Sequence, residues 1–180
     1  MSNSLFNYFI SLLRAFPCIM PVSCLLFGII FQNKTGLIFG IYCILIDKIC
    51  SNSLKKLSEH LYKVFNTDYI PILGIGKRPE NAKYCGCFID ENNLEGKSTS
   101  FGMPSGHSML AIFTAVFWSL YILENYEDDY KRNISLLVLN VCCILVCLSR
   151  VYLNCHTIQQ VIVGSIIGFI LGSLGYKLYK

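Results

Sequence analysis

Apolar residues along this chain gather in blocks that are separated by polar turns and loops. A helix needs about 20 residues to cross the hydrocarbon core of a bilayer. Each block is shorter than that, so flanking residues complete the crossing. The pattern therefore predicts membrane spans rather than a soluble core, and the blocks cover residues 17–31, 37–46, 109–123, 134–148 and 158–174.

Two further segments have a helical pattern. Residues 1–15 carry apolar side chains at helical spacing and end near Arg14, which predicts an interfacial helix or the start of the first span. They lack a positively charged lead-in and a small-residue cleavage site, so we do not expect a removable signal peptide. Residues 51–65 are helical and polar on one side, and they could continue the preceding span out of the bilayer.

The fold class follows from these segments. We predict an all-α, integral-membrane helical bundle of about five to six spans, in one domain over residues 1–180. Gly164, Gly168 and Gly172 recur every fourth residue and predict a face for close helix packing. Residues 66–103 form a long polar connection, and loops of that length often carry function.

Composition and charge agree with a membrane protein. The chain is 54% hydrophobic and 14% charged, and its net charge is +4. The basic residues lie mainly around the polar loops, without a basic-aromatic stripe, so we expect contacts with membrane lipids and not with nucleic acid. Most of the ten cysteines lie in apolar segments, where cysteine behaves as a small hydrophobe. Cys85 and Cys87 lie in the loop but lack the paired spacing of a zinc site.

The candidate chemistry gathers on one side of the predicted bundle. Alternate crossings place the 66–103 loop and the 149–157 turn on the same face. Three polar motifs occur there, namely Lys77-Arg78-Pro79, Pro104-Ser105-Gly106-His107, and Ser149-Arg150 followed by His156.

The motif from Pro104 to His107 closes the loop and opens an apolar block. Proline is favoured in the first turn of a helix. Ser105 and Gly106 then offer a hydroxyl and backbone N–H groups at the positive end of the helix dipole, which suits phosphate. His107 can give or take a proton near neutral pH. This stretch therefore predicts a phosphate site at a membrane surface.

Each of the other motifs has an ordinary interpretation when it stands alone. Lys77 and Arg78 could anchor headgroups, Arg150 could snorkel, and His156 could be an interfacial histidine. On one continuous helix Arg150 and His156 would lie on different faces, about 240° apart. A short break around residues 152–155 would turn both toward one pocket. The three motifs together favour the phosphate site over these separate interpretations.

In these motifs the sequence resembles the type 2 phosphatidic acid phosphatases, the lipid phosphatase/haloperoxidase superfamily. The family signature is a lysine with Arg-Pro seven and eight residues later, then Pro-Ser-Gly-His, then Ser-Arg with a histidine six residues after the arginine. The second and third parts match completely. The resemblance covers residues 37–174, and the run from His156 to Val161 with Gly164 is most similar to the dolichyl diphosphatase branch.

The resemblance implies a mechanism without metal or other cofactor. His156 would attack phosphorus and form a phosphohistidine, and His107 would protonate the leaving oxygen and then assist water. The phosphoryl oxygens would be held by Arg78, Arg150, Ser105 and the Gly106 N–H, with Lys77 beside them.

Two positions depart from the family pattern. Pro71 occupies the place of the first-motif lysine, so that Lys77 or Lys56 would have to replace it. Gln160, four residues after His156, stands where many members have aspartate. A glutamine can orient the imidazole but supplies no negative charge.

We therefore predict an integral-membrane, multi-pass phosphatase for a lipid-linked phosphate or diphosphate, with a polyprenyl or dolichyl diphosphate favoured. In a eukaryote it would lie in the endoplasmic reticulum membrane. The alternatives are a phosphatidic acid or glucose-6-phosphate type of phosphatase, or an inactive lipid-binding relative. The sidedness stays open, because lysines outside the motifs favour a cytoplasmic active face while the resemblance favours the lumen. The sequence does not indicate the oligomeric state.

Overall fold

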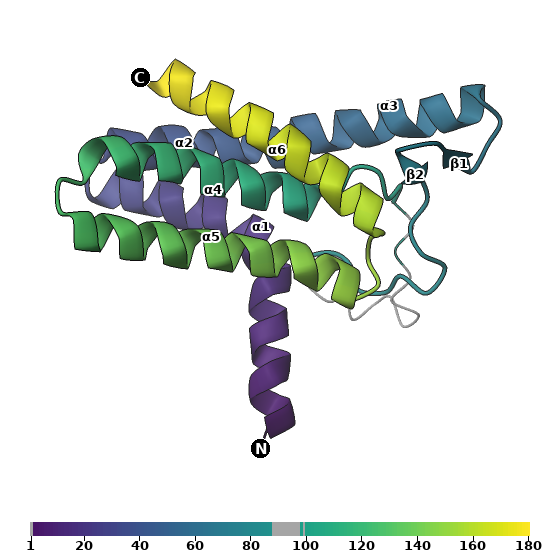
Figure 1. The fold of residues 1–180 in the computed structure, drawn as a ribbon, viewed down its shortest axis with the longest axis horizontal. Coiled ribbons are helices and arrows are strands. Elements are labelled where there is room, and N and C mark those ends of the chain that lie inside the picture. The colour runs from purple at the N-terminus through teal and green to yellow at the C-terminus, as the bar shows by residue number, and fades with distance from the viewer. Residues whose placement is uncertain (1, 88–97, 99) are drawn as a thin grey trace.

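The computed structural model describes residues 2–87, 98 and 100–180, and they form an almost entirely helical protein (Figure 1). Within them, five helical segments are long and apolar enough to cross a membrane. The predicted all-α membrane bundle is confirmed, and the chain is an integral multi-pass membrane protein. The elements in chain order are α1 (Ser2–Ile30), α2 (Lys34–Ile44), the π-helix η1 (Leu45–Cys50), α3 (Ser51–Val64), β1 (Tyr69–Ile70), β2 (Gly74–Ile75), α4 (Gly106–Asn125), α5 (Asp129–Tyr152) and α6 (Ile158–Tyr179).

The second crossing is one rod made of α2, η1 and α3. The apolar part spans the bundle, and the amphipathic α3 extends past it toward β1 and β2 (Figure 1). The expected continuation of residues 51–65 from the preceding span is therefore confirmed. The η1 segment widens the helix locally. Such π-helical turns are rare in proteins, and those that occur often lie at functional sites.

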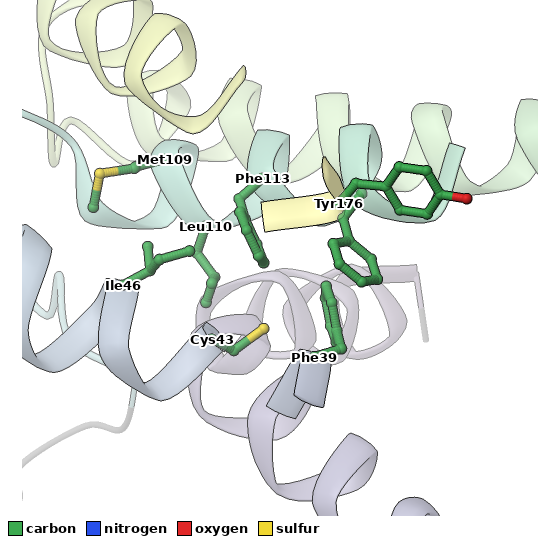
Figure 2. Packing of buried hydrophobic residues seen from close by; sticks show 8 residues of the cluster. Phe39, Cys43, Ile46, Met109, Leu110, Phe113 and Tyr176 are labelled. Carbon is green, nitrogen blue, oxygen red and sulfur yellow. The ribbon is translucent and has the colours of Figure 1, made fainter. Parts of the chain in front are cut away.

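Helix α4 lies at the centre of the packing. Aromatic and aliphatic side chains of α2 and η1 face those of α4, and Tyr176 of α6 closes the cluster (Figure 2). The rings of Phe39 and Phe113 stack with centroids 5.6 Å apart. This packing fixes where the α4 N-terminus lies relative to the second crossing. The buried cluster consists of Phe39, Cys43, Ile46, Met109, Leu110, Phe113, Phe117 and Tyr176.

Helices α4 and α6 approach each other along the predicted glycine face. A Cβ atom on Gly164 would lie 2.5 Å from the Ser105 carbonyl oxygen, and one on Gly168 would overlap the Met109 carbonyl. Such backbone contact is possible only because glycine has no side chain. The glycine spacing therefore does mark a close helix–helix contact, and this contact brings the start of α4 beside the start of α6.

Helix α1 changes direction along its length. Its C-terminal part packs in the bundle, while its N-terminal part projects away from it (Figure 1). Pro17 and Pro21 lie inside this helix. Proline removes a helical N–H donor and its ring displaces the carbonyl four residues earlier, so it is the usual cause of a sharp bend.

The topology brings the predicted loop and turn to the same end of the bundle. The start of α4, the end of α5 and the start of α6 lie there, next to β1 and β2 (Figure 1). The main chain of Gly76 accepts hydrogen bonds from Gly102 and Met103, both at 3.1 Å, and Ser105 donates to the Gln160 carbonyl. Segments far apart in the sequence therefore meet at this end.

Candidate active site

A cavity of about 380 Å³ opens at this end of the bundle. It is lined by two histidines, an arginine and two lysines, together with small polar side chains of the second crossing. A single carboxylate, Asp47, lines it among the described residues, and that carboxylate pairs with Lys48 at 3.0 Å. The cavity is therefore electropositive. Its described lining is Pro17, Asp47, Lys48, Ser51, Asn52, Lys55, Arg78, Cys85, Gly86, Cys87, Ser98, Ser100, Gly106, His107 and His156.

His156 reaches the cavity because helix α5 ends just before it. The chain turns after Tyr152, and Asn154 adopts a left-handed φ of 52°. The N–H of His156 then donates to the carbonyl of Arg150 at 3.2 Å. The predicted break between the two residues is present, and it folds His156 back onto the last turn of α5.

Gln160 fixes the orientation of the His156 ring. Its side-chain nitrogen donates to the carbonyls of Ile75 and Lys77, both at 2.8 Å. The amide oxygen must therefore face His156, whose Nδ1 lies 3.0 Å away and acts as the donor. Nε2 of His156 keeps its lone pair and faces the cavity. Gln160 also completes the capping box of α6 with Thr157.

Arg78 lies directly beside that lone pair. Its Nη1 is 3.0 Å from His156 Nε2 and donates to the Cys155 carbonyl at 2.8 Å. Nε and Nη2 contact Ser100. Burial lowers the pKa of Arg78 to about 10, so the guanidinium stays charged at neutral pH. Burial, followed by the charges of Arg78 and Arg150, holds the pKa of His156 well below 6.5 and keeps its ring neutral.

Arg150 is fully buried and is not among the residues that line the cavity. Its Nη2 donates to the Cys85 carbonyl at 3.0 Å. Nε and Nη1 are buried without a partner among the described residues, as is Nε of Arg14 on α1. A buried donor without an acceptor is costly, roughly 1–3 kcal/mol for a neutral group and more for a charged one. An oxyanion at this site would supply the missing acceptors.

The Pro104–His107 motif forms the N-terminus of α4, but Pro104 precedes the helix and does not lie in its first turn as predicted. Ser105 is the N-cap, and the helix begins at Gly106. The Ser105 hydroxyl is fully buried and contacts Ser108, so it stabilises the helix end and is not part of the cavity lining. Gly106 and His107 do line the cavity. A Cβ atom on Gly106 would lie 2.7 Å from the Ser51 hydroxyl oxygen, so a larger residue would close this part of the cavity.

A comparison with protein-family models matches residues 64–180 to the PAP2 superfamily. The chain belongs to this superfamily. The match begins within α3 and includes every motif residue discussed above. It leaves out α1, α2, η1 and all of α3 except Val64, and residues of α1, η1 and α3 line part of the same cavity.

Curated proteins with sequences similar to this PAP2 chain are lipid phosphatases by name. Dolichyldiphosphatase of Saccharomyces cerevisiae is 28% identical over 171 residues, which are 92% of this chain and 62% of that protein. Dolichyldiphosphatase 1 of Dictyostelium discoideum is 38% identical over 85 residues, 46% of this chain and 37% of that protein. Mouse sphingosine-1-phosphate phosphatase 2 is 37% identical over 76 residues, 42% and 21% of the two chains. This chain therefore spans less than two thirds of these relatives. No solved structure matches it.

Two lysines line this PAP2 site, Lys48, which pairs with Asp47, and Lys55, and the motif analysis predicted neither as a site residue. Lys77 lies outside the lining of the cavity and pairs with Asp68 at 2.7 Å on the surface. Lys56 is exposed and is not among the residues that line the cavity. Asp47, Ser51 and Lys55 follow one another at four-residue spacing, which places them on one helix face. That polar stripe is the sequence signal that could have found Lys55.

Two disulfides connect segments around the site, and the sequence patterns predicted neither of them. Cys85 pairs with Cys155, and Cys18 pairs with Cys87. Cys18 was interpreted as a small hydrophobe of an apolar segment, but it faces the loop. The carbonyls of Cys85 and Cys155 are also the acceptors for Arg150 and Arg78. The Cys85–Cys155 bridge therefore ties together the main-chain anchors of both arginines.

Proposed function

We propose that the protein hydrolyses a lipid-linked diphosphate, a polyprenyl or dolichyl diphosphate, through a phosphohistidine intermediate. The observation that carries the proposal is the cavity in which His156 presents Nε2 beside Arg78 while His107 lines the same space. A neutral, oriented imidazole next to fixed cations is suited to attack a phosphoryl group.

The reaction has two steps. His156 Nε2 attacks phosphorus, the bond from phosphorus to the leaving oxygen breaks, and His107 donates a proton to that oxygen. Water then attacks the phosphohistidine while His107 accepts its proton, the N–P bond breaks, and inorganic phosphate leaves. His107 starts the first step as the protonated imidazolium, and the two steps together return both imidazoles to their starting states.

The cations hold the charge that these steps develop. Arg78 now contacts the nucleophile, and a bound phosphoryl group would take over that guanidinium contact. Arg150 would use its unpartnered Nε and Nη1, and Lys55 would take the place of the first-motif lysine. The alternative of an inactive relative rested on the missing first-motif lysine, and Lys55 in the cavity argues against that alternative.

A lipid substrate fits the place of the cavity in the bundle. The lining comes from the ends of membrane-crossing helices, so a hydrocarbon tail can stay in the bilayer while its headgroup reaches the histidines. The chain is similar to two dolichyldiphosphatases, and this favours the polyprenyl diphosphate and an endoplasmic reticulum membrane in a eukaryotic cell. A lipid monophosphate is the second candidate, because sphingosine-1-phosphate phosphatase 2 also matches.

The test is phosphate release by the full chain purified in detergent, with excess chelator present. Dolichyl diphosphate, sphingosine 1-phosphate, phosphatidic acid and glucose 6-phosphate are compared at equal concentration. We expect the highest kcat/KM on dolichyl diphosphate, and loss of activity in His156→Ala. A preference for sphingosine 1-phosphate would select the second candidate instead.

His60→Ala is the matched control for the nucleophile, because His60 is an exposed histidine of α3 outside the cavity lining. It should keep the rate of the unmodified protein. Denaturation of the reacting protein under alkaline conditions, which preserve the acid-labile N–P bond of phosphohistidine, should give a phosphorylated protein in the unmodified chain and none in His156→Ala. Full activity of the His156 variant would remove the proposed nucleophile.

A further inference from the structure

One turn of α1, from Arg14 to Cys18, contacts the site at three points. The carbonyl oxygen of Arg14 lies 3.0 Å from Nε2 of His107. Pro17 lines the cavity, and Cys18 forms the disulfide with Cys87 of the cavity-lining loop. This turn lies outside residues 64–180, the part of the chain that matches the PAP2 superfamily.

Packing holds the turn in this place. Leu13 is buried in a cluster with Ala111 and Ala115 of α4 and Val146 of α5. Pro17 is also buried. Pro17 lies inside α1 and has no N–H to donate, which favours a bend, and α1 changes direction along its length (Figure 1). A bent helix can direct a main-chain carbonyl of this turn to an outside donor.

The Cys18–Cys87 bridge gives this turn a second anchor. Cys18 is four residues after Arg14, so the two lie on the same side of α1. Cys87 belongs to the loop that, through Cys85, also accepts the hydrogen bond of Arg150. The bridge therefore links the position of the Arg14 carbonyl to the loop beside the arginines.

We propose that the turn Arg14–Cys18 is a positioning element of the active site: the Arg14 carbonyl holds the ring of His107, and the bridge to Cys87 holds the carbonyl in place. The role of His107 rests on the proposed phosphatase reaction, but its placement by α1 does not.

The contact decides which nitrogen of His107 can work. A carbonyl can only accept, so Nε2 carries the proton and donates it to Arg14. Nδ1 is left to give or take the proton of the reaction. His156 is in the opposite tautomer, with its proton on Nδ1 and its lone pair on Nε2. The two imidazoles therefore use different ring atoms, and each is fixed by a backbone or amide oxygen.

A main-chain substitution tests the carbonyl directly. Replacing Ala15 by lactic acid converts the Arg14–Ala15 amide to an ester and weakens the Arg14 carbonyl as an acceptor. The matched control replaces Leu12 by its hydroxy acid, which weakens the carbonyl of Ser11. Both changes disturb the helical hydrogen bond from the Ala15 N–H to the Ser11 carbonyl, because the first removes its donor and the second weakens its acceptor. Only the first change weakens the carbonyl that contacts His107.

The readout that needs no turnover is the nitrogen spectrum of the histidines. The chain has three histidines, so ¹⁵N-histidine labelling with a His60→Gln variant leaves two histidines, with two ring nitrogens each, to assign. We expect His107 to be the Nε2–H tautomer in the unmodified protein and in the Leu12 control, and to become a mixture in the Ala15 ester. An Nδ1–H tautomer of His107 in the unmodified protein would overturn the proposal, whatever the enzyme hydrolyses.

The bridge is tested with Cys18→Ser, Cys87→Ser and the double variant. Each single change breaks the same disulfide, so each should lower kcat about three- to tenfold with little change in KM. The double variant should lower kcat no further, because the bond is already lost in either single variant. The alkaline limb of the kcat profile should shift in all three, since His107 loses its fixed acceptor. Cys24→Ser, a free cysteine of the same helix, is the control. Unchanged pH profiles in the bridge variants would refute the positioning role.

Discussion

Replacing Gln160 by glutamate separates two accounts of this site. Many PAP2 relatives have an aspartate at this position, so a carboxylate next to His156 would by analogy strengthen the nucleophile. The contacts of Gln160 argue the opposite. Its nitrogen donates at 2.8 Å to the carbonyls of Ile75 and Lys77, and it is fully buried. An ionised glutamate has no donor, so it would leave both carbonyls without a partner.

The size of the effect follows from those two hydrogen bonds. Each unsatisfied buried acceptor costs roughly 1–3 kcal/mol, so Gln160→Glu should destabilise the protein by about 2–6 kcal/mol. In a chain of this size each kcal/mol corresponds to about 2–4 °C in Tm. Protonation of the new carboxyl would restore one donor, so its pKa should be raised in the folded state. A raised pKa means that the folded protein binds the proton more tightly, and the deficit should shrink as the pH falls.

The assay is thermal unfolding in detergent between pH 5 and pH 8, together with phosphate release. Gln159→Glu makes the same change at the neighbouring, exposed position and should leave both unchanged. If Gln160→Glu matched the unmodified protein in Tm and rate at pH 8, the anchoring role of the amide would be disproved.

Three further outcomes are expected. Lys55→Ala should lower kcat/KM by roughly 10- to 150-fold, which corresponds to the loss of a charge-assisted hydrogen bond of about 1.5–3 kcal/mol. Lys77→Ala breaks only an exposed ion pair and should lower kcat/KM less than about fivefold. Steady-state kinetics on one lipid substrate decide between the two lysines. Because the pKa of His156 is depressed, kcat/KM should fall on the acid side only below pH 6.5. The free energy of unfolding should decline over the same range, since the unfolded chain takes up the proton first. A midpoint of the acid limb of kcat/KM above pH 7 would contradict this. Gly168→Ala should lower Tm more than Gly175→Ala, because its Cβ would meet a main-chain carbonyl of α4 and that of Gly175 only an aromatic ring at 3.2 Å.

Sequence reasoning predicted the bundle and a common site for the motif residues, because both have strong local signals. Of those residues, Arg78, Gly106, His107 and His156 line one cavity. Lys77, Ser105 and Arg150 lie outside that lining. The apolar blocks determine the crossings, and their alternation places the loop and the turn on one face. Lys55 was missed because motif spacing was counted along the chain, whereas the cavity is lined by a helix face. Arg14 and Cys18 were missed for another reason. Their partners lie 93 and 69 residues away, and no local pattern carries contacts of that range.

The two disulfides also bear on which side of the membrane this chemistry takes place. Bonds of this kind persist in the secretory lumen or outside the cell, while glutathione keeps cytosolic thiols reduced. Because both bridges lie on the active face, we expect that face to be turned away from the cytosol, against the bias of its lysines. Inorganic phosphate from the proposed reaction would then be released on that side of the membrane, and it would need a carrier to cross back to the cytosol.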